Sequence, residues 1–187
     1  MQILSVVECA RWLNERAVTL SSRNYPLLPE LEVLEFPVPS DAGETVALAY
    51  MFADMERATC AGGIFFIREW NIGSPGLDAI GHEIVKRMLS IHDSGVDTDR
   101  PFGVALDASE GGLVPSLLLQ AMIFGWDAFY VSSASAFVIF ISHDEVVYIA
   151  TRDASPNDDV RIQFERLSVG SVATPYYLSL AANQEVL

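Results

Sequence analysis

The stretch WDAFYVSSASAFVIFISHDEVVYIAT, residues 126–151, decides the fold. It contains two continuous apolar runs, Trp126–Val131 and Phe137–Ile141, separated by the small and polar residues 132–136. Short runs rich in aromatic and β-branched residues are typical of strands that are buried on both faces. The sequence therefore predicts a hairpin near the centre of a sheet. Val146–Ala150 adds a third strand after a turn at residues 143–145.

Two helices are expected in the first 60 residues. Ser5 and Glu8 have the spacing of a capping box, which predicts a helix from about residue 6 to residue 20. Ser40–Asp41 can cap a second helix that runs through Ala58, although residues 45–52 also fit a strand. We favour the helix.

Two prolines mark the starts of later helices, because a proline at the first helical position loses no hydrogen bond. The helix that begins at Pro75 has one apolar stripe, which is expected to be buried. Its members are Leu77, Ile80, Ile84, Met88 and Ile91. The helix that begins at Pro115 ends at Gly125 and is apolar almost all the way round, so it must be covered on every side.

Further strands complete the predicted sheet. In GIFFIREW, residues 63–70, alternation places Arg68 and Trp70 on one face and Glu69 on the other. Residues 31–36 read as a short edge strand because prolines flank them, and residues 102–106 and 160–167 as further strands. The expected fold is a single α+β domain over residues 1–187. Its central sheet is mixed or antiparallel, with a C-terminal strand hairpin, and three to four helices pack on it.

Charge is distributed unevenly along the 187 residues, whose formal net charge is −14. Residues 24–56 contain seven carboxylates and residues 101–151 contain five, and neither stretch contains a lysine or arginine. One interpretation is a solvated surface that keeps the protein soluble. The other is an electronegative face that attracts a basic protein partner.

The same composition argues against several classes of protein. Only 11 basic side chains are present, so nucleic acid and anionic membranes are not expected partners. The N-terminus lacks the basic start of a signal peptide, and the longest apolar stretch, residues 113–126, is short for a bilayer span. With two distant cysteines and no disulfide framework, the cytoplasm is the expected location.

Ser142-His143-Asp144-Glu145 invites a catalytic interpretation, because an imidazole lies beside a hydroxyl and two carboxylates. Adjacent residues point to opposite sides of a strand, so a turn is the better interpretation of this segment. His143, Asp144 and His82 are kept as catalytic candidates, with His82 expected on an exposed helix face beside Asp78 and Lys86.

No cofactor or metal is expected from the sequence. The glycine pairs 62–63 and 111–112 lack the lysine and the spacing of a phosphate-binding loop. Residues 153–159 alternate like the start of a calcium loop, but Asp158 stands where that loop needs glycine and Phe164 where it needs glutamate.

The segments IREWNI (67–72), FGWDAFYV (124–131) and FISHDE (140–145) together resemble small bacterial proteins of unassigned biochemistry, some of them similar to immunity proteins encoded beside toxins. The resemblance covers residues 63–149. It implies an α+β domain that binds and neutralises a protein and is not a catalyst.

Three hypotheses follow for function. The first is an acidic cytoplasmic binding protein that engages a basic partner. Its candidate contact residues are Glu30, Glu32, Glu35, Glu69, Trp70, Trp126, Asp127, Asp144 and Glu145. The second is a small hydrolase or isomerase that uses a histidine and a carboxylate. The third is an oligomeric scaffold assembled through the apolar helix at residues 117–124.

Overall fold

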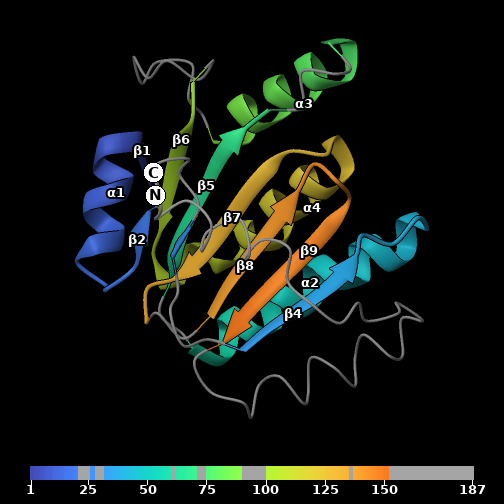
Figure 1. Cartoon of the computed structure of the whole chain (residues 1–187). Coiled ribbons are helices and arrows are strands. Elements are labelled where there is room, and N and C mark those ends of the chain that lie inside the picture. Colours follow the sequence, from blue (N-terminus) through green and yellow to red (C-terminus); the bar gives the residue numbers. More distant parts are fainter. Residues whose placement is uncertain are drawn as a thin grey trace, which may run out of the picture.

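The computed structural model describes residues 1–20, 26–27, 32–59, 62–70, 75–89, 100–134 and 137–151. An open antiparallel sheet of seven strands lies at the centre, in the order β1-β6-β5-β7-β8-β9-β4 (Figure 1). Its strands are β1 (Gln2–Ser5), β4 (Glu32–Pro37), β5 (Gly63–Glu69), β6 (Phe102–Leu106), β7 (Asp127–Ser132), β8 (Phe137–Ser142) and β9 (Val146–Thr151). The short strands β2 (Thr19–Leu20) and β3 (Pro26–Leu27) pair separately.

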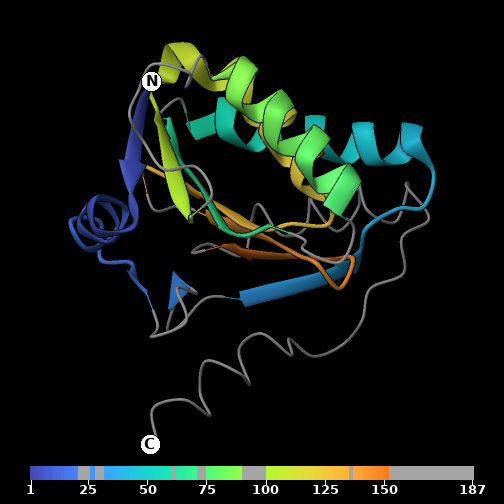
Figure 2. The same cartoon turned by 90° about the horizontal axis from the view of Figure 1, so that it is seen from above.

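In the described part of the chain, four helices pack on this sheet, which confirms the predicted α+β class. They are α1 (Val6–Asn14), α2 (Ala42–Thr59), α3 (Pro75–Met88) and α4 (Val114–Phe124), and the 3-10 helix η2 (Ala108–Leu113) precedes α4. Figure 2 shows α2, α3 and α4 on one side of the sheet, whereas α1 lies beside β1 on the other. Apolar clusters form on both faces, so the central strands are buried on both sides.

Most of the predicted elements are confirmed. β7 and β8 form the central hairpin, β9 follows after the turn, and β4 is an edge strand. Ser5 and Glu8 make the predicted capping box. Residues 45–52 belong to helix α2, whose first amides donate to Asp41 Oδ1. α4 ends at Gly125, which has a positive φ of 62°.

The first helix is shorter than predicted. It ends at Asn14, Ala17 adopts a left-handed φ of 57°, and the Val18 amide then donates to the Leu13 carbonyl. This turn redirects the chain, so residues 19–20 form β2. The strand β1, which precedes this helix and pairs with β6, is not predicted from the sequence. Its four residues are too few to show the alternation of apolar and polar side chains that is typical of a strand.

The predicted buried stripe of α3 is wrong at Ile80 and Ile84, whereas Met88 packs against the core as predicted. The side chain of Leu77 and residue Ile91 lie outside what the structure describes. Ile80 and Ile84 are 55% and 40% exposed, whereas Val85 is fully buried and Leu89 is 2% exposed. Gly81 explains the difference, because a Cβ there would lie 2.6 Å from the Trp126 ring. The side of the helix that carries Gly81 therefore faces the core, because a residue without a Cβ lets the helix backbone approach Trp126 closely.

α4 is largely covered by the chain itself. Leu117, Leu118 and Ala121 are fully buried, whereas Ile123 is 59% exposed. No helix among the described residues is both long and apolar enough to cross a membrane. The strand expected at residues 160–167 and the polar segment at 153–159 lie outside the described residues.

Candidate functional site

The pairing of the strands brings several of the predicted contact and catalytic residues to one end of the sheet. Glu69 at the end of β5 pairs with Asp127 at the start of β7. Next along the sheet, β8 ends at Ser142, which pairs with Val146 at the start of β9. The β8–β9 turn at residues 143–145 therefore lies at the same end as Glu69 and Asp127.

Asp127 is the buried centre of this end, with only 1% of the residue exposed. Its Oδ1 accepts a hydrogen bond from the backbone amide of His143, at 2.8 Å. The same oxygen lies 2.9 Å from Nδ1 of the His143 ring. Its Oδ2 forms an ion pair with the Arg68 guanidinium. Charge-assisted bonds of this kind compensate the carboxylate for the loss of water.

A β-bulge positions Arg68 for this contact. The pairing of β5 with β7 shifts between Ile67 and Glu69. A bulge re-aims the side chains that follow it, and this corrects the expected placement of Trp70. Trp70 packs against the helix-side core, whereas alternation had placed it with Ile64 on the opposite face.

The imidazole of His143 is oriented by the buried carboxylate. An ionised carboxylate can only accept, so Nδ1 carries the proton toward Asp127. The other ring nitrogen, Nε2, is 3.6 Å from Asp144 Oδ1, and 51% of the His143 side chain is exposed. A histidine held in one tautomer with its second nitrogen near solvent can exchange a proton there.

The β8–β9 turn is fixed from both sides. Its Glu145 amide donates to the Ser142 carbonyl at 3.1 Å, and its Glu145 carbonyl accepts from the Val38 amide at 2.7 Å. Glu145 itself has a left-handed φ of 61°. That conformation costs a residue other than glycine roughly 1–2 kcal/mol, so these surrounding contacts must hold it.

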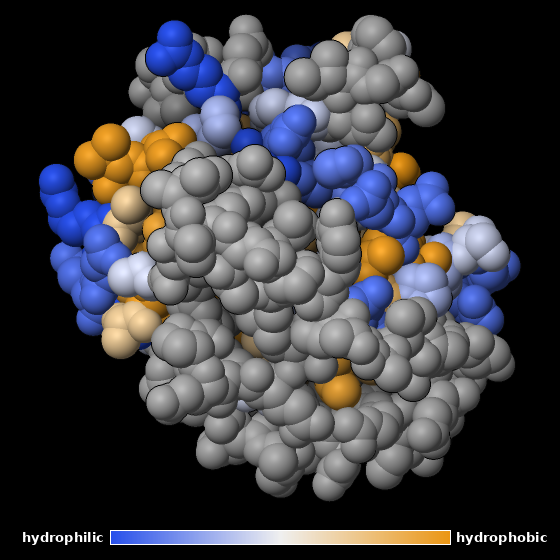
Figure 3. All heavy atoms as spheres, viewed as in Figure 1, coloured by the Kyte–Doolittle hydropathy of each residue, from blue (hydrophilic) through white to orange (hydrophobic). Residues whose placement is uncertain are grey.

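The start of α2 follows closely after this contact, because Val38, the residue after β4, donates to the turn and stands three positions before the Asp41 cap. We call the carboxylates of this region the acidic end: Asp41, Glu44, Glu69, Asp144 and Glu145. The side chains of Glu69 and Asp144 are 50% and 69% exposed. Hydrophilic side chains gather over the β8–β9 turn in Figure 3.

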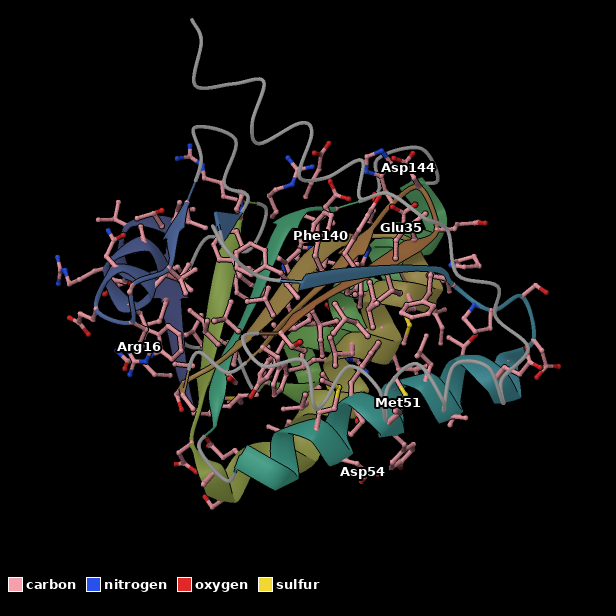
Figure 4. All side chains as sticks on the ribbon, turned by 60° about the horizontal axis from the view of Figure 1, so that its bottom comes forward. Arg16, Glu35, Met51, Asp54, Phe140 and Asp144 are labelled. Carbon is pink, nitrogen blue, oxygen red and sulfur yellow. The ribbon has the colours of Figure 1, made fainter. Side chains whose placement is uncertain are left out.

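The two base-free stretches of sequence do not form one face. Asp107 and Glu110 follow β6 at the opposite end of the sheet, where Leu106 pairs with Gly63. Glu35 and Asp144 lie on the same side of the sheet as Phe140, whereas Asp54 lies on α2 on the other side (Figure 4). One buried oxygen of Glu35, Oε2, has no hydrogen-bond partner among the described residues. Glu30 and the side chain of Glu32 lie outside what the structure describes.

His82, Trp70 and Trp126 form an aromatic cluster behind the acidic end. The Trp70 ring lies 4.5 Å from the His82 ring and 4.5 Å from the Trp126 ring. Trp126 is fully buried and His82 is half-buried. The expectation that His82 stands on an exposed helix face is therefore wrong, because its ring packs on Trp70.

The predicted contact residues differ in whether a partner could reach them. Trp126 and Asp127 are covered by the chain, so they can position this end of the sheet but cannot touch a partner. Sequence reasoning missed Arg68 as the counter-ion of Asp127. The signal was a single arginine directly after the apolar part of β5, residues 63–67, because a buried arginine requires an acidic partner.

Neither a metal site among the described residues nor a matching known protein adds to this geometry. Among the described residues, no three His, Cys, Asp or Glu side chains are placed to hold a metal ion. Comparison with protein-family models, with curated proteins and with solved structures finds no match to this chain.

Proposed function

We propose that this chain is a binding protein whose acidic end engages a basic protein partner. The observation that carries the proposal is the β8–β9 turn, which presents two adjacent exposed carboxylates, Asp144 and Glu145, from a fixed backbone. Complementary charge steers association and suppresses wrong partners. No lysine or arginine occurs between residues 24 and 56 or between 101 and 151, so the turn and the start of α2 carry charge of one sign.

Preorganisation supports the same proposal. The turn is anchored through His143 to buried Asp127, and Asp127 is neutralised by Arg68. A surface that is already ordered loses less conformational entropy on binding. Glu145 supports it as well, since asparagine or glycine would adopt a φ of 61° at lower cost, yet a charged side chain stands there.

The partner class follows from charge and from the resemblance to immunity proteins. The charge favours a basic partner and the resemblance implies a protein partner, with a toxin encoded by an adjacent gene as the first candidate. We place the protein in the cytoplasm. The support is its sparse cysteines and the buried Cys9 thiol, whose pKa burial raises to about 12, so that it stays protonated.

The test is the affinity for the products of adjacent genes, measured by calorimetry at several salt concentrations. The double variant Asp144→Asn, Glu145→Asn removes both charges of the turn and tolerates the positive φ at residue 145. We expect it to weaken binding at least about tenfold, which is about 1.4 kcal/mol. The dependence of affinity on salt should become weaker as well.

A matched control removes the same charge elsewhere. Glu15→Gln with Asp54→Asn changes the net charge equally, and both side chains are exposed on other elements, at the end of α1 and on α2. Equal loss of affinity in the two double variants would mean that only the total charge matters. Absence of binding to any adjacent-gene product would also contradict the proposal.

A second candidate function rests on the 2.9 Å contact between His143 Nδ1 and Asp127 Oδ1. In a general-base site, a buried carboxylate holds the imidazole so that its other nitrogen faces the substrate. The corresponding activity is hydrolysis or isomerisation at His143 Nε2. The neighbouring Asp144 carboxylate would favour a substrate group that donates a proton.

This second candidate is tested with an activated ester, p-nitrophenyl acetate. The wild type should hydrolyse it faster than His143→Gln, because the substitution removes the nitrogen that would accept the proton. His82→Gln serves as the control, because His82 packs against Trp70. Equal rates in the wild type and His143→Gln would contradict it.

A further inference from the structure

The outer side of helix α2 carries an uncharged stripe at the surface. Residues three and four positions apart lie on one face of a helix. Four exposed residues of α2 follow this spacing, and we call them the α2 stripe: Gly43, Val46, Ala47 and Tyr50. Its two large side chains, Val46 and Tyr50, are 38% and 56% exposed, whereas Leu48 and Phe52 on the inner side are fully buried.

The α2 stripe faces away from the sheet. Figure 4 shows Met51 on the side of α2 toward the sheet and Asp54 on the side away from it. Tyr50 precedes Asp54 by one helical turn, so it lies on the outer side as well. Asp54 already interacts with another group of the chain, so the stripe ends at Tyr50. At the other end, a Cβ on Gly43 would meet only Asp41 Oδ1 within 4 Å among the described residues.

Tyr50 is the only exposed aromatic residue in the described part of the chain. Tyrosine is enriched among the residues that dominate the energy of protein interfaces, because its ring supplies a large contact area with few rotatable bonds. The face of the ring also attracts the guanidinium of an arginine. Both properties suit Tyr50 to a contact with a basic protein.

The charge beside the stripe restricts the chemistry of what can bind there. Asp41 and Glu44 of the acidic end stand at the start of α2, and no lysine or arginine occurs between residues 24 and 56. Tyr50 lies about 12 Å along the helix axis from the first residue of α2. A standard interface buries about 800 Å² on each partner, which is wide enough to include both ends of this distance. A basic partner at the acidic end can therefore contact the α2 stripe at the same time.

We infer that the α2 stripe is the apolar part of the partner-binding surface. It binds a segment of the basic partner in which apolar side chains lie beside arginines or lysines. Val46 and Tyr50 contact the apolar side chains, and the basic groups face the acidic end. A second copy of this chain does not fit, because its net charge of −14 has the same sign. The inference rests on the proposed function and specifies the chemistry of its partner.

Calorimetry with two synthetic helical peptides of equal charge tests the inference. The first peptide has leucines on one side and arginines on the other, and the second has glutamine in place of each leucine. The wild type should bind the leucine peptide at least about tenfold more tightly than the glutamine peptide. Val46→Ala with Tyr50→Ala should remove most of this preference. Asp144→Asn with Glu145→Asn should weaken both peptides alike and leave the preference unchanged.

A matched variant controls for apolar contacts elsewhere on the surface. Val7→Ala with Ile80→Ala removes two side chains that are 70% and 55% exposed, on α1 and α3. All four substituted residues are at the surface and alanine favours helix, so circular dichroism should show unchanged folding in both variants. The control should keep the preference for the leucine peptide. A preference that the control loses as fully as the α2 variant would overturn the inference.

The outcomes separate this inference from the proposed function. If the wild type binds both peptides equally, or binds neither, the inference is wrong, while the acidic end is still judged by the titration of adjacent-gene products. If the leucine peptide binds through Val46 and Tyr50 but Asp144→Asn with Glu145→Asn leaves its affinity unchanged, the stripe and the acidic end do not form one surface. That result would also overturn the inference.

Discussion

His143 and Asp127 are 16 positions apart in the sequence, and the carboxylate of Asp127 holds both the backbone amide and the ring of His143. One buried side chain thereby joins the start of β7 to the turn after β8. The same carboxylate is neutralised by Arg68 from β5. Three segments of the sheet end are thus tied to one point.

Removing Asp127 should be strongly destabilising. Asp127→Ala leaves the Arg68 guanidinium, whose side chain is 13% exposed, without its buried counter-ion. Breaking a buried pair in this way typically costs about 3–5 kcal/mol. Urea unfolding measures this loss. Asp144→Ala, at an exposed residue of the same network, should stay within about 0.5 kcal/mol of the wild type, and a similar loss in both variants would contradict the central position of Asp127.

The packing of α3 on the aromatic cluster depends on Gly81. Gly81→Ala places a methyl group 2.6 Å from the Trp126 ring and 2.7 Å from the Phe124 ring. We expect a loss of about 1–3 kcal/mol in the free energy of unfolding, as is typical of an overpacked core. The matched variant Gly76→Ala meets no atom within 4 Å, so its stability should be unchanged or higher by up to about 1 kcal/mol. Equal effects at both glycines would contradict this packing.

The capping box of α1 should make stability depend on pH. Hydrogen bonds from the Ser5 side chain and backbone hold the pKa of Glu8 below its ordinary value. A carboxyl with a lowered folded-state pKa stabilises the fold above its unfolded pKa of about 4.3 and loses that contribution as pH falls through the folded value. Glu8→Gln should therefore be less stable than the wild type at neutral pH, and this difference should shrink in acid. A difference that is constant with pH would contradict the prediction.

Burial should protect Cys9 from thiol reagents. The thiol is fully buried, its Sγ lies 3.7 Å from the Leu4 carbonyl, and burial raises its pKa to about 12. Because the thiolate is the reactive form, modification by an aromatic disulfide should require unfolding. The measurement compares the rate at Cys9 in a Cys60→Ser background with and without urea. Rapid modification of the native protein would show that α1 opens readily.

Local signals in the sequence predicted most of the fold. Ser5 with Glu8, Pro115 with Gly125 and the apolar runs of β7 and β8 each specify structure within a few residues, and the structure confirms them. The early end of α1 comes from the local turn at Ala17, whereas the error in α3 comes from a tertiary contact. The face of α3 that is buried depends on the approach of Gly81 to Trp126, which no periodicity contains.

The site was harder to derive from the sequence than the fold. The turn predicted at Ser142-His143-Asp144-Glu145 is confirmed for residues 143–145, and Ser142 is the last residue of β8. The partner of His143 is Asp127 on another strand, and strand register alone brings the two together. Arg68 reaches the same carboxylate through a bulge that alternation cannot reveal. Charge counted along the chain could not show that Asp107 and Asp144 lie at opposite ends of the sheet.

The most direct test of the central claim compares the affinity for the products of adjacent genes between the wild type and two double variants. The products of adjacent genes are titrated into the wild type, into Asp144→Asn, Glu145→Asn, and into the control Glu15→Gln, Asp54→Asn. We expect tight binding that salt weakens, at least about a tenfold loss in the turn variant, and little change in the control. Binding that is equal in all three proteins, or binding that is insensitive to salt, would contradict a partner site at the acidic end.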